Sequence, residues 1–391
     1  MIWIQEANIP YLNKVEDLLV EEGKIKCVGR EKIQTYILEK KAEYRIVKAE
    51  GLYLLPSFVD SHFHLRNPGF EYKQTYEEAS RACMKGGYTD VVAMANTKPV
   101  VDSCEVLKEI AEKSSAYPLD VYQVGSVTKG LGGRELVDFE ELMKYTNIFS
   151  DDGKNIDDEE VMRQALIASK ELGFLIMDHS EPETEMVIRN LKILEEVGGN
   201  LHFCHVSRKA SVEAIVKAKE KGLNATLEVT PHHIFSHSLS YRVNPPIATA
   251  EDMEFLVEAI KRGYIDYIGT DHAPHTCEDK KKGAPGIINI ENAYAMVRKI
   301  FYDNNVSWKE MVELMAFRPA ALVNKKRGLD EGDVADLVLL SDKESVIDPQ
   351  GFVTRSKNTP YEGREVRGAV EMTIVKGEIV YDNERIATKS N

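Results

Sequence analysis

Short apolar runs alternate with longer amphipathic stretches through the middle of the chain. Residues 90–94 (DVVAM) and 174–177 (FLIM) are two of the apolar runs, and runs of this length are typical of buried strands. The stretches between them have apolar residues at helical spacing, as at Val161, Ala165 and Leu172. Eight such strand–helix units predict an α/β fold and, more specifically, a (β/α)8 TIM-like barrel. The strands are expected at 54–60, 89–94, 119–124, 147–150, 174–178, 201–205, 224–229 and 265–270.

The two ends of the chain have a different pattern. Residues 1–7, 15–21 and 24–28 near the start, and 334–340, 369–375 and 378–381 near the end, are apolar or alternate between apolar and polar. Glu22-Gly23 and Lys376-Gly377 are turn signals between consecutive members of each group. We therefore expect residues 1–52 and 330–391 to form one small β-sandwich domain, and residues 53–329 to form the barrel.

Histidines are confined to the part of the chain expected to form the barrel. All ten lie between His62 and His275. Residues two apart in a strand point to the same side, so His62 and His64 should project together from a strand end. Imidazole is a common ligand for zinc and similar ions, and this pair predicts half of a metal site.

Polar side chains follow five of the expected strands at the point where each apolar run stops. Because the carboxyl ends of barrel strands meet at one face, these side chains should converge there. Four histidines and two aspartates suit one or two divalent ions, with zinc favoured over calcium or magnesium. A metal makes hydroxide available near neutral pH, and a carboxylate can pass its proton to a leaving nitrogen. The candidates are His62 and His64, Asp152 or its neighbour Asp151, His179, His205 and Asp271.

Composition and charge restrict the classes of molecule that the protein is expected to bind. The chain is 43% hydrophobic and 29% charged, with a formal net charge of −14. This balance disfavours nucleic acid and anionic membranes, and it means that an anionic substrate needs locally placed cations. The longest apolar run, residues 52–59, is too short to span a bilayer, and residues 1–6 lack the features of a signal peptide. We therefore expect a cytoplasmic protein. None of the five cysteines forms a C-x-x-C pair, so we expect reduced, mostly buried thiols.

The motifs at the strand ends resemble those of the amidohydrolase superfamily, and within it those of the dihydroorotases of the bacterial, aspartate-bridged type. The similarity runs over nearly the whole chain, and the combination of HLR, ANT and DHAPH is specific for this subgroup. The matching segments are PSFVDSHFHLRNPG (56–69), MANTKP (94–99), SDDG (150–153), MDH (177–179), HVS (205–207), VNPP (243–246) and TDHAPH (270–275).

The resemblance implies a centre of one or two zinc ions. The first ion would be held by His62, His64 and Asp271, and a second, bridged through Asp152, by His179 and His205. Asp151 competes with Asp152 for the bridge. Asp271 would also be the catalytic residue, acting as general base toward the hydroxide and as general acid toward the ring nitrogen.

The same resemblance implies a set of substrate contacts. Arg66 and Asn96 would clamp the substrate carboxylate, a role that a planar two-donor guanidinium suits. Asn244, His275, Pro285 and Gly286 would make further contacts. The remaining histidines are expected to be structural or to lie outside the ligand set; they are His202, His232, His233, His237 and His272.

The implied activity is the reversible, zinc-dependent cyclisation of N-carbamoyl-L-aspartate to L-dihydroorotate in pyrimidine biosynthesis, with attack by metal-bound hydroxide in the hydrolytic direction. One alternative is another cyclic amidohydrolase, such as a hydantoinase, dihydropyrimidinase or allantoinase. Those relatives use a carboxylated lysine as the bridge and give no reason for Arg66. A second alternative is a non-catalytic homologue that partners aspartate carbamoyltransferase, although this sequence keeps all six candidate ligands. The resemblance also implies a homodimer and allows association with aspartate carbamoyltransferase.

Overall fold

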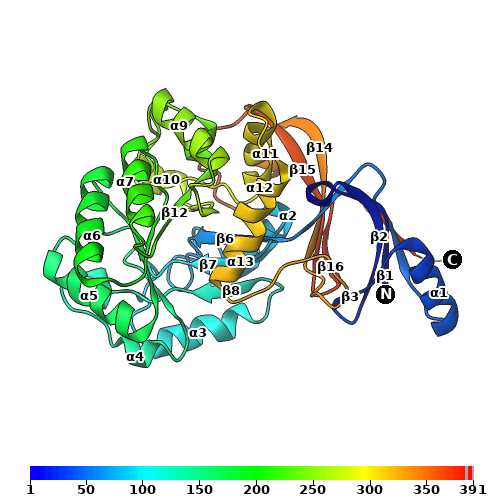
Figure 1. The fold of residues 1–391 in the computed structure, drawn as a ribbon, viewed down its shortest axis with the longest axis horizontal. Coiled ribbons are helices and arrows are strands. Elements are labelled where there is room, and N and C mark those ends of the chain that lie inside the picture. Colours follow the sequence, from blue (N-terminus) through cyan, green and yellow to red (C-terminus); the bar gives the residue numbers. More distant parts are fainter. Residues whose placement is uncertain (384–385, 390–391) are drawn as a thin grey trace.

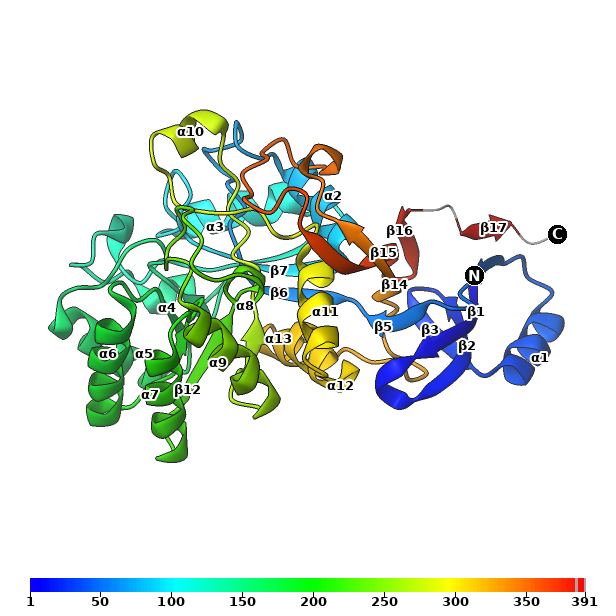
Figure 2. The ribbon, with the colours of Figure 1, turned by 90° about the horizontal axis from the view of Figure 1, so that it is seen from above.

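Two regions lie side by side in the computed structural model, which describes residues 1–383 and 386–389 (Figure 1). The larger region consists of parallel strands surrounded by helices. The smaller one is a mostly antiparallel sheet at one end of the molecule, with the N-terminus and the C-terminal strand close to each other (Figure 2). The predicted α/β class with parallel sheets is confirmed.

Eight parallel strands build the larger region within the described residues. Hydrogen bonds connect them in chain order as one set of three and one set of five. Isolated parallel bridges join the edges of the two sets, Phe63 with His272 and Gly125 with Phe149. All eight strands therefore end toward the same side. They are β6 (Phe58–Phe63), β7 (Tyr88–Ala93), β8 (Asp120–Gln123), β9 (Ile148–Phe149), β10 (Leu175–Asp178), β11 (Leu201–Phe203), β12 (Ala225–Val229) and β13 (Tyr267–Ile268).

The helices of this region begin and end at residues that suit helix termini. In α2, for example, Thr75 and Glu78 form a reciprocal capping box at the start, and Gly87 adopts the left-handed conformation after the end. Apolar faces such as Ala79 and Ala82 of α2 are buried against the strands. The larger helices are α2 (Tyr76–Gly86), α3 (Cys104–Ser114), α5 (Glu159–Leu172), α6 (Glu183–Val197), α7 (Lys209–Glu220), α9 (Ala250–Lys261) and α11 (Ala293–Asp303).

Shorter helices lie in the connections that follow several strands. They include α4 (Phe139–Leu142), α8 (Pro231–Phe235), α10 (Cys277–Lys281), α12 (Trp308–Val312) and α13 (Arg318–Leu322), with a single π-helical turn at Glu313–Phe317 between the last two. α10 matters for the site, because it begins directly after the segment that ends in His275.

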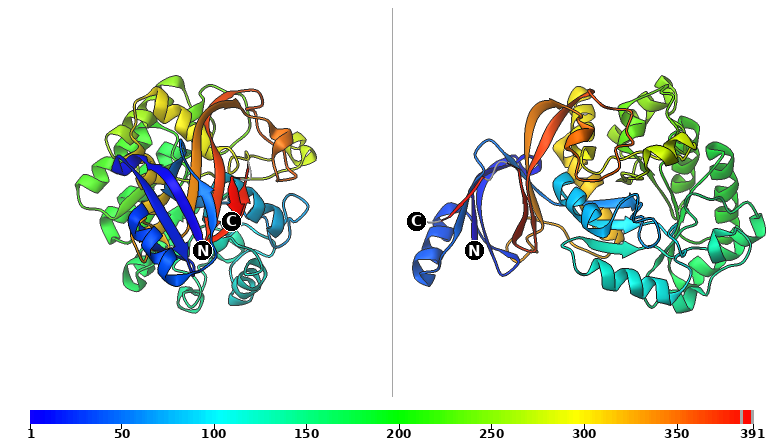
Figure 3. Two further views of the ribbon diagram at one scale, coloured as in Figure 1. Left: turned by 90° about the vertical axis from the view of Figure 1, so that its right-hand side faces the viewer. Right: turned by 180° about the vertical axis from the view of Figure 1, so that it is seen from behind.

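Strands from both ends of the chain form the second sheet, as Figure 3 shows. Its order is β16-β15-β14-β5-β1-β2-β3, with β4 between β1 and β17. Ile4, Leu18, Leu337 and Ile374 belong to its apolar core, so both ends contribute. The strands are β1 (Ile2–Ile9), β2 (Lys14–Glu21), β3 (Lys24–Val28), β4 (Arg45–Lys48), β5 (Tyr53–Pro56), β14 (Leu337–Val346), β15 (Glu365–Val375), β16 (Glu378–Asp382) and β17 (Ala387–Lys389).

Two local features differ from the prediction. The single strand expected at 54–60 is two strands, because β5 pairs with β14 of the terminal sheet whereas β6 pairs with β7. The change occurs at Ser57, whose N–H donates to the carbonyl of Asp336. Helix α1 (Arg30–Lys40) lies where only strands were expected; its apolar stripe is short, with Ile33 buried and Tyr36 and Ile37 partly buried beside it.

Among the described residues, no helix is both long and apolar enough to cross a membrane. Cys27, Cys83, Cys104 and Cys204 are buried free thiols, and Cys277 is an exposed one. The expectation of mostly buried, unpaired cysteines agrees with this arrangement.

Candidate active site

A polar cavity of about 210 Å³ opens at the carboxyl ends of the parallel strands. It contains nearly every residue that the sequence singled out; His62, which is fully buried, and Asp151, the competing candidate for the bridge, do not line it. The lining residues are His64, Arg66, Asn96, Asp152, Gly153, His179, His205, Asn244, Asp271, Ala273, His275, Pro285 and Gly286.

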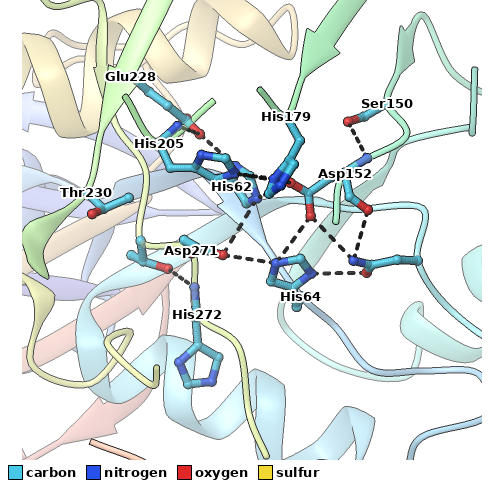
Figure 4. Close-up of polar contacts among 12 residues, drawn as sticks. His62, His64, Ser150, Asp152, His179, His205, Glu228, Thr230, Asp271 and His272 are labelled. Atoms are coloured by element: carbon cyan, nitrogen blue, oxygen red, sulfur yellow. Dashed lines mark hydrogen bonds and ion pairs between the residues drawn. The ribbon is translucent and has the colours of Figure 1, made fainter. Parts of the chain in front are cut away.

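Four imidazole rings surround the Asp152 carboxylate (Figure 4). Its Oδ1 lies 3.3 Å from His205 Nε2, 3.4 Å from His179 Nδ1 and 3.5 Å from His62 Nε2. Its Oδ2 lies 3.5 Å from His64 Nε2. Among the described residues three groups are close enough to hold an ion, and two of them share Asp152: His62–His64–Asp152 and Asp152–His179–His205. The third, His62–Cys204–Glu228, lies behind His62 and lacks the cavity-lining carboxylate, so we take the two that share Asp152 as the ligand groups.

The tautomers of the first two histidines fit a metal. His62 Nδ1 lies 2.6 Å from Glu228 Oε1, and His64 Nδ1 lies 3.0 Å from Asn96 Oδ1. Each Nδ1–H donates to that oxygen, so each Nε2 presents a lone pair toward Asp152. His62 Nε2 is buried and has no hydrogen-bond partner among the described residues. A buried acceptor without a partner is unfavourable, and a divalent cation would satisfy it.

Asp151 and Asp152 point in different directions. Asp151 accepts hydrogen bonds from the backbone N–H groups of Val127 and Thr128, at 2.8 and 3.0 Å, and from the Thr128 hydroxyl. It therefore fastens a neighbouring loop. Asp152 faces the histidines instead, and this geometry supports it as the bridging carboxylate rather than Asp151.

Asp271 lies at the edge of the same cluster. Its Oδ1 is 3.0 Å from His64 Nε2 and 3.8 Å from His62 Nε2. Burial acts to raise the pKa of Asp271, but positive charge held at His64 and His62, as ring protons or as a bound cation in their place, outweighs it, so the pKa lies below its ordinary value. The carboxylate is thus ionised and able to receive a proton at neutral pH.

Arg66 and His275 form a cationic end of the cavity. Arg66 is 8% exposed, its Nε donates to the carbonyl of Pro274, and its Nη2 lies 3.1 Å from His275 Nε2. Burial lowers the pKa of Arg66 to about 10, which leaves it charged at neutral pH. Within a chain of net charge −14, this buried guanidinium is the local cation that an anionic substrate requires.

Asn96, predicted to belong to the carboxylate clamp, and Asn244, predicted as a further substrate contact, both have other partners. Asn96 contacts His64 through its oxygen, and its amide nitrogen lies 3.4 Å from Asp152 Oδ2. Asn244 donates to Glu181 Oε2 at 3.0 Å. Both line the cavity, so their predicted contact with a substrate stays a prediction.

Only glycine fits at position 286 in the wall of the cavity. Its φ is +131°, and a Cβ at this position would lie 2.8 Å from the Ala273 Cβ and 3.0 Å from the His275 Cδ2. The Lys280 ammonium donates to the carbonyls of Arg242, Ala284 and Gly286 at 2.8, 2.8 and 2.9 Å. This lysine ties the loop that carries Asn244 to the one that carries Pro285 and Gly286.

The sequence reasoning missed several residues around the site. Glu228, fully buried in β12, contacts His62, and Glu181 lies 3.6 Å from His179 Nε2. A glutamate inside the apolar run ATLEV was a usable signal for Glu228. Glu181 stands in the polar segment DHSE that ends its strand, but the sequence reasoning assigned it no role. The other histidines lie outside the two ligand groups: His202, His232, His233 and His272 are buried, and His237 is exposed.

The fold and this cluster define a hydrolase of a known class. Residues 53–380 match the model of the amidohydrolase family, and the chain belongs to that family. It is 38% identical to a dihydroorotase of Clostridium botulinum (strain Eklund 17B / Type B), with 93% of this chain and 95% of the relative covered. A dihydroorotase of Thermoanaerobacter sp. (strain X514) is 34% identical over 95% of both chains.

Solved structures show the same fold at lower sequence identity. An L-hydantoinase (dihydropyrimidinase) from Arthrobacter aurescens superposes with a TM-score of 0.86 at 22% identity, over 98% of this chain and 96% of that one. A D-hydantoinase (dihydropyrimidinase) from Thermus sp. has a TM-score of 0.84 at 20% identity. At these identities the likeness supports the architecture alone.

Proposed function

We propose that this protein is a dihydroorotase, which interconverts N-carbamoyl-L-aspartate and L-dihydroorotate. The observation that carries the proposal is the buried Arg66–His275 pair at one end of the cavity whose other end is the Asp152 cluster. A cyclic amide with a carboxylate substituent would match both ends. An uncharged ring, such as a hydantoin, would leave the Arg66 guanidinium buried without an anion. Relatives named dihydroorotase at 34% and 38% identity support the same activity.

Neutral imidazoles and carboxylates form the donor set expected for zinc. One or two zinc ions would activate water and polarise the amide carbonyl. The residues that would hold them are His62, His64, Asp152, His179, His205 and Asp271. Asp271 has the position to move protons. Its carboxylate would receive the proton of the attacking water and pass it to the ring nitrogen as the carbon–nitrogen bond breaks. The cyclisation direction reverses these transfers.

Arg66 orients the substrate in this proposal. Its guanidinium is held by the Pro274 carbonyl through Nε, which leaves the Nη groups to bind a carboxylate. Asn96, Asn244 and the Pro285–Gly286 backbone would complete the contacts around the ring. This binding fixes the amide carbon against the metal cluster and excludes water from the charged groups.

Finer features of the architecture belong to the same proposal. The bridges Phe63–His272 and Gly125–Phe149 support closure of the parallel strands into a (β/α)8 barrel. The shared apolar core of the terminal sheet supports a β-sandwich domain built from residues 1–52 and 330–391. The family resemblance also supports a homodimer and association with aspartate carbamoyltransferase. Light scattering of the protein alone tests the first, and light scattering after mixing with aspartate carbamoyltransferase tests the second.

The deciding experiment combines metal analysis with substrate comparison. The purified protein should contain zinc, hydrolyse L-dihydroorotate, form it from N-carbamoyl-L-aspartate, and lose both activities on chelation. Hydantoin, dihydrouracil and allantoin are the competing substrates. Rapid turnover of any of these without turnover of dihydroorotate would favour the other cyclic amidohydrolases. Absence of turnover of all four by the metal-loaded protein would favour the non-catalytic homologue.

A further inference from the structure

His275 lies between two cationic side chains. Its Nε2 is 3.1 Å from Arg66 Nη2, and its Nδ1 is 3.2 Å from Lys73 Nζ. All three side chains are buried, with exposures of 7% for His275, 8% for Arg66 and 9% for Lys73. Lys73 comes from the loop between β6 and α2 and does not line the cavity, so it can act on a substrate only through His275.

A neutral imidazole cannot satisfy both neighbours. Burial, with the charges of Arg66 and Lys73, lowers the pKa of His275 to about 2, so the ring is neutral at physiological pH. A neutral ring has one lone pair and one N–H. Guanidinium and ammonium groups have donors only. Therefore, while both neighbours are charged, one ring nitrogen has to face a donor with its own N–H.

The surroundings of Lys73 indicate that Lys73, rather than Arg66, donates to the single lone pair of the His275 ring. Asp279 Oδ2 lies 3.7 Å from Lys73 Nζ, and the ring centroids of Phe70 and Tyr72 lie 5.1 and 5.6 Å from it. Burial, together with the charge of Arg66, lowers the pKa of Lys73, whereas the Asp279 carboxylate and the two aromatic faces favour an ammonium ion at this position. The backbone is also held, because Ser356 Oγ donates to the carbonyl of Lys73.

We propose that Lys73 is a positioning residue for the substrate carboxylate: it donates to His275 Nδ1 and so keeps the ring proton on Nε2. His275 and Arg66 then direct two N–H donors, from atoms 3.1 Å apart, toward one point of the cavity. A carboxylate there accepts from both and relieves the contact between the two donors. The inference rests on the proposed function, because it names the device by which that site selects an anion.

The device should act on binding rather than on the chemical step. A carboxylate gains two hydrogen bonds and removes an unfavourable contact, whereas an uncharged ring substituent would leave that contact in place. Loss of Lys73 would free the ring to take the other tautomer, in which Nε2 accepts from Arg66. His275 would then present a lone pair toward the substrate carboxylate, and affinity would fall.

Kinetics of Lys73→Met, Lys73→Arg and Lys281→Met, all loaded with metal, form the first part of the test. Lys281→Met is the matched control, because it removes one positive charge from exposed α10 nearby. We expect Lys73→Met to raise the KM for L-dihydroorotate about tenfold, the loss expected for one charge-assisted hydrogen bond, with little change in kcat. Lys73→Arg should recover part of the loss, and Lys281→Met should match the parent.

Heteronuclear NMR of the histidine ring nitrogens forms the second part, and it does not depend on turnover or on any Lys73 variant. The His275 signals are those that disappear in His275→Asn. In the parent protein, Nε2 should carry the proton and Nδ1 should be unprotonated. A proton on Nδ1, an unchanged KM in folded Lys73→Met, or an equal KM increase in Lys281→Met would each overturn the inference. Failure of the dihydroorotase proposal would appear separately, as absent turnover by the parent protein.

Discussion

Glu228 Oε1 lies 2.6 Å from His62 Nδ1, and both side chains are fully buried. The other carboxylate oxygen accepts the Ser61 hydroxyl at 2.5 Å. One glutamate in β12 thus fixes the tautomer of a histidine at the end of β6 and directs its free lone pair toward Asp152. Carboxylates in this position typically change metal affinity by about 10- to 100-fold.

Glu228→Gln should therefore weaken metal binding by about 10- to 100-fold, because a neutral amide holds the imidazole less strongly. Competition with a chromophoric chelator measures this change. Glu213→Gln, on the exposed side of α7, is the control and should bind metal like the parent. Equal affinities for Glu228→Gln and the parent would contradict the role assigned to Glu228.

Arg66→Met should raise the KM for L-dihydroorotate about 10- to 100-fold, because a charge-assisted carboxylate contact is lost. Metal content should stay that of the parent, since Arg66 is in neither ligand group. Arg66→Lys keeps the charge but loses the two-donor geometry, and we expect an intermediate KM. Full activity in Arg66→Met would show that the carboxylate binds elsewhere.

Asp271→Asn should lower kcat by about 100- to 10,000-fold, because an amide cannot carry the proton from water to the ring nitrogen. Asp271 also touches the metal cluster, so metal content has to be measured on the same samples. A rate loss that exceeds any metal loss supports the proton-transfer role. Appreciable kcat in the metal-loaded variant would rule it out.

The adjacent pair Asp151 and Asp152 gives a matched comparison. Asp152→Asn should reduce metal content and activity, because it changes the carboxylate shared by both ligand groups. Asp151→Asn should retain metal but lower the free energy of unfolding by about 1–3 kcal/mol, since it weakens buried bonds to Val127 and Thr128. Metal analysis and urea unfolding separate the two outcomes, and the reverse pattern would make Asp151 the bridge.

The burial of His232 predicts that the free energy of unfolding depends on pH. Burial lowers its pKa to about 4, against about 6.5 for the unfolded chain. Between these values the unfolded state binds a proton that the folded state does not, so stability falls as pH decreases. Between pH 6.5 and 4 the His232 imidazole lowers the free energy of unfolding by about 3 kcal/mol. His232→Asn should make the fall between pH 6.5 and 4 less steep by this contribution, measured by urea unfolding; an unchanged slope would contradict the assignment.

Much of the site was predictable because its residues follow strands that local patterns reveal. The alternation of apolar runs and amphipathic stretches located the parallel strands, and the spacing of His62 and His64 put both rings on one side. The missed helix α1 shows the limit of this reasoning, because its apolar stripe is only Ile33, Tyr36 and Ile37, too short to stand out among the neighbouring strand patterns. Ser57, where the chain passes from one sheet to the other, was equally hidden within a continuous apolar run.

By itself, then, the sequence determined the fold class, the face on which the site lies and the residue types that build it. Tertiary structure decided which way neighbouring side chains point and which distant ones meet. Asp151 and Asp152 are adjacent, yet only the packing of their loops sends one to Thr128 and the other to the histidines. Glu228 reaches His62 across 166 residues, and Lys73 reaches His275 across 202. Local periodicity carries no information on such contacts, because they depend on how separate strands and loops are placed against one another.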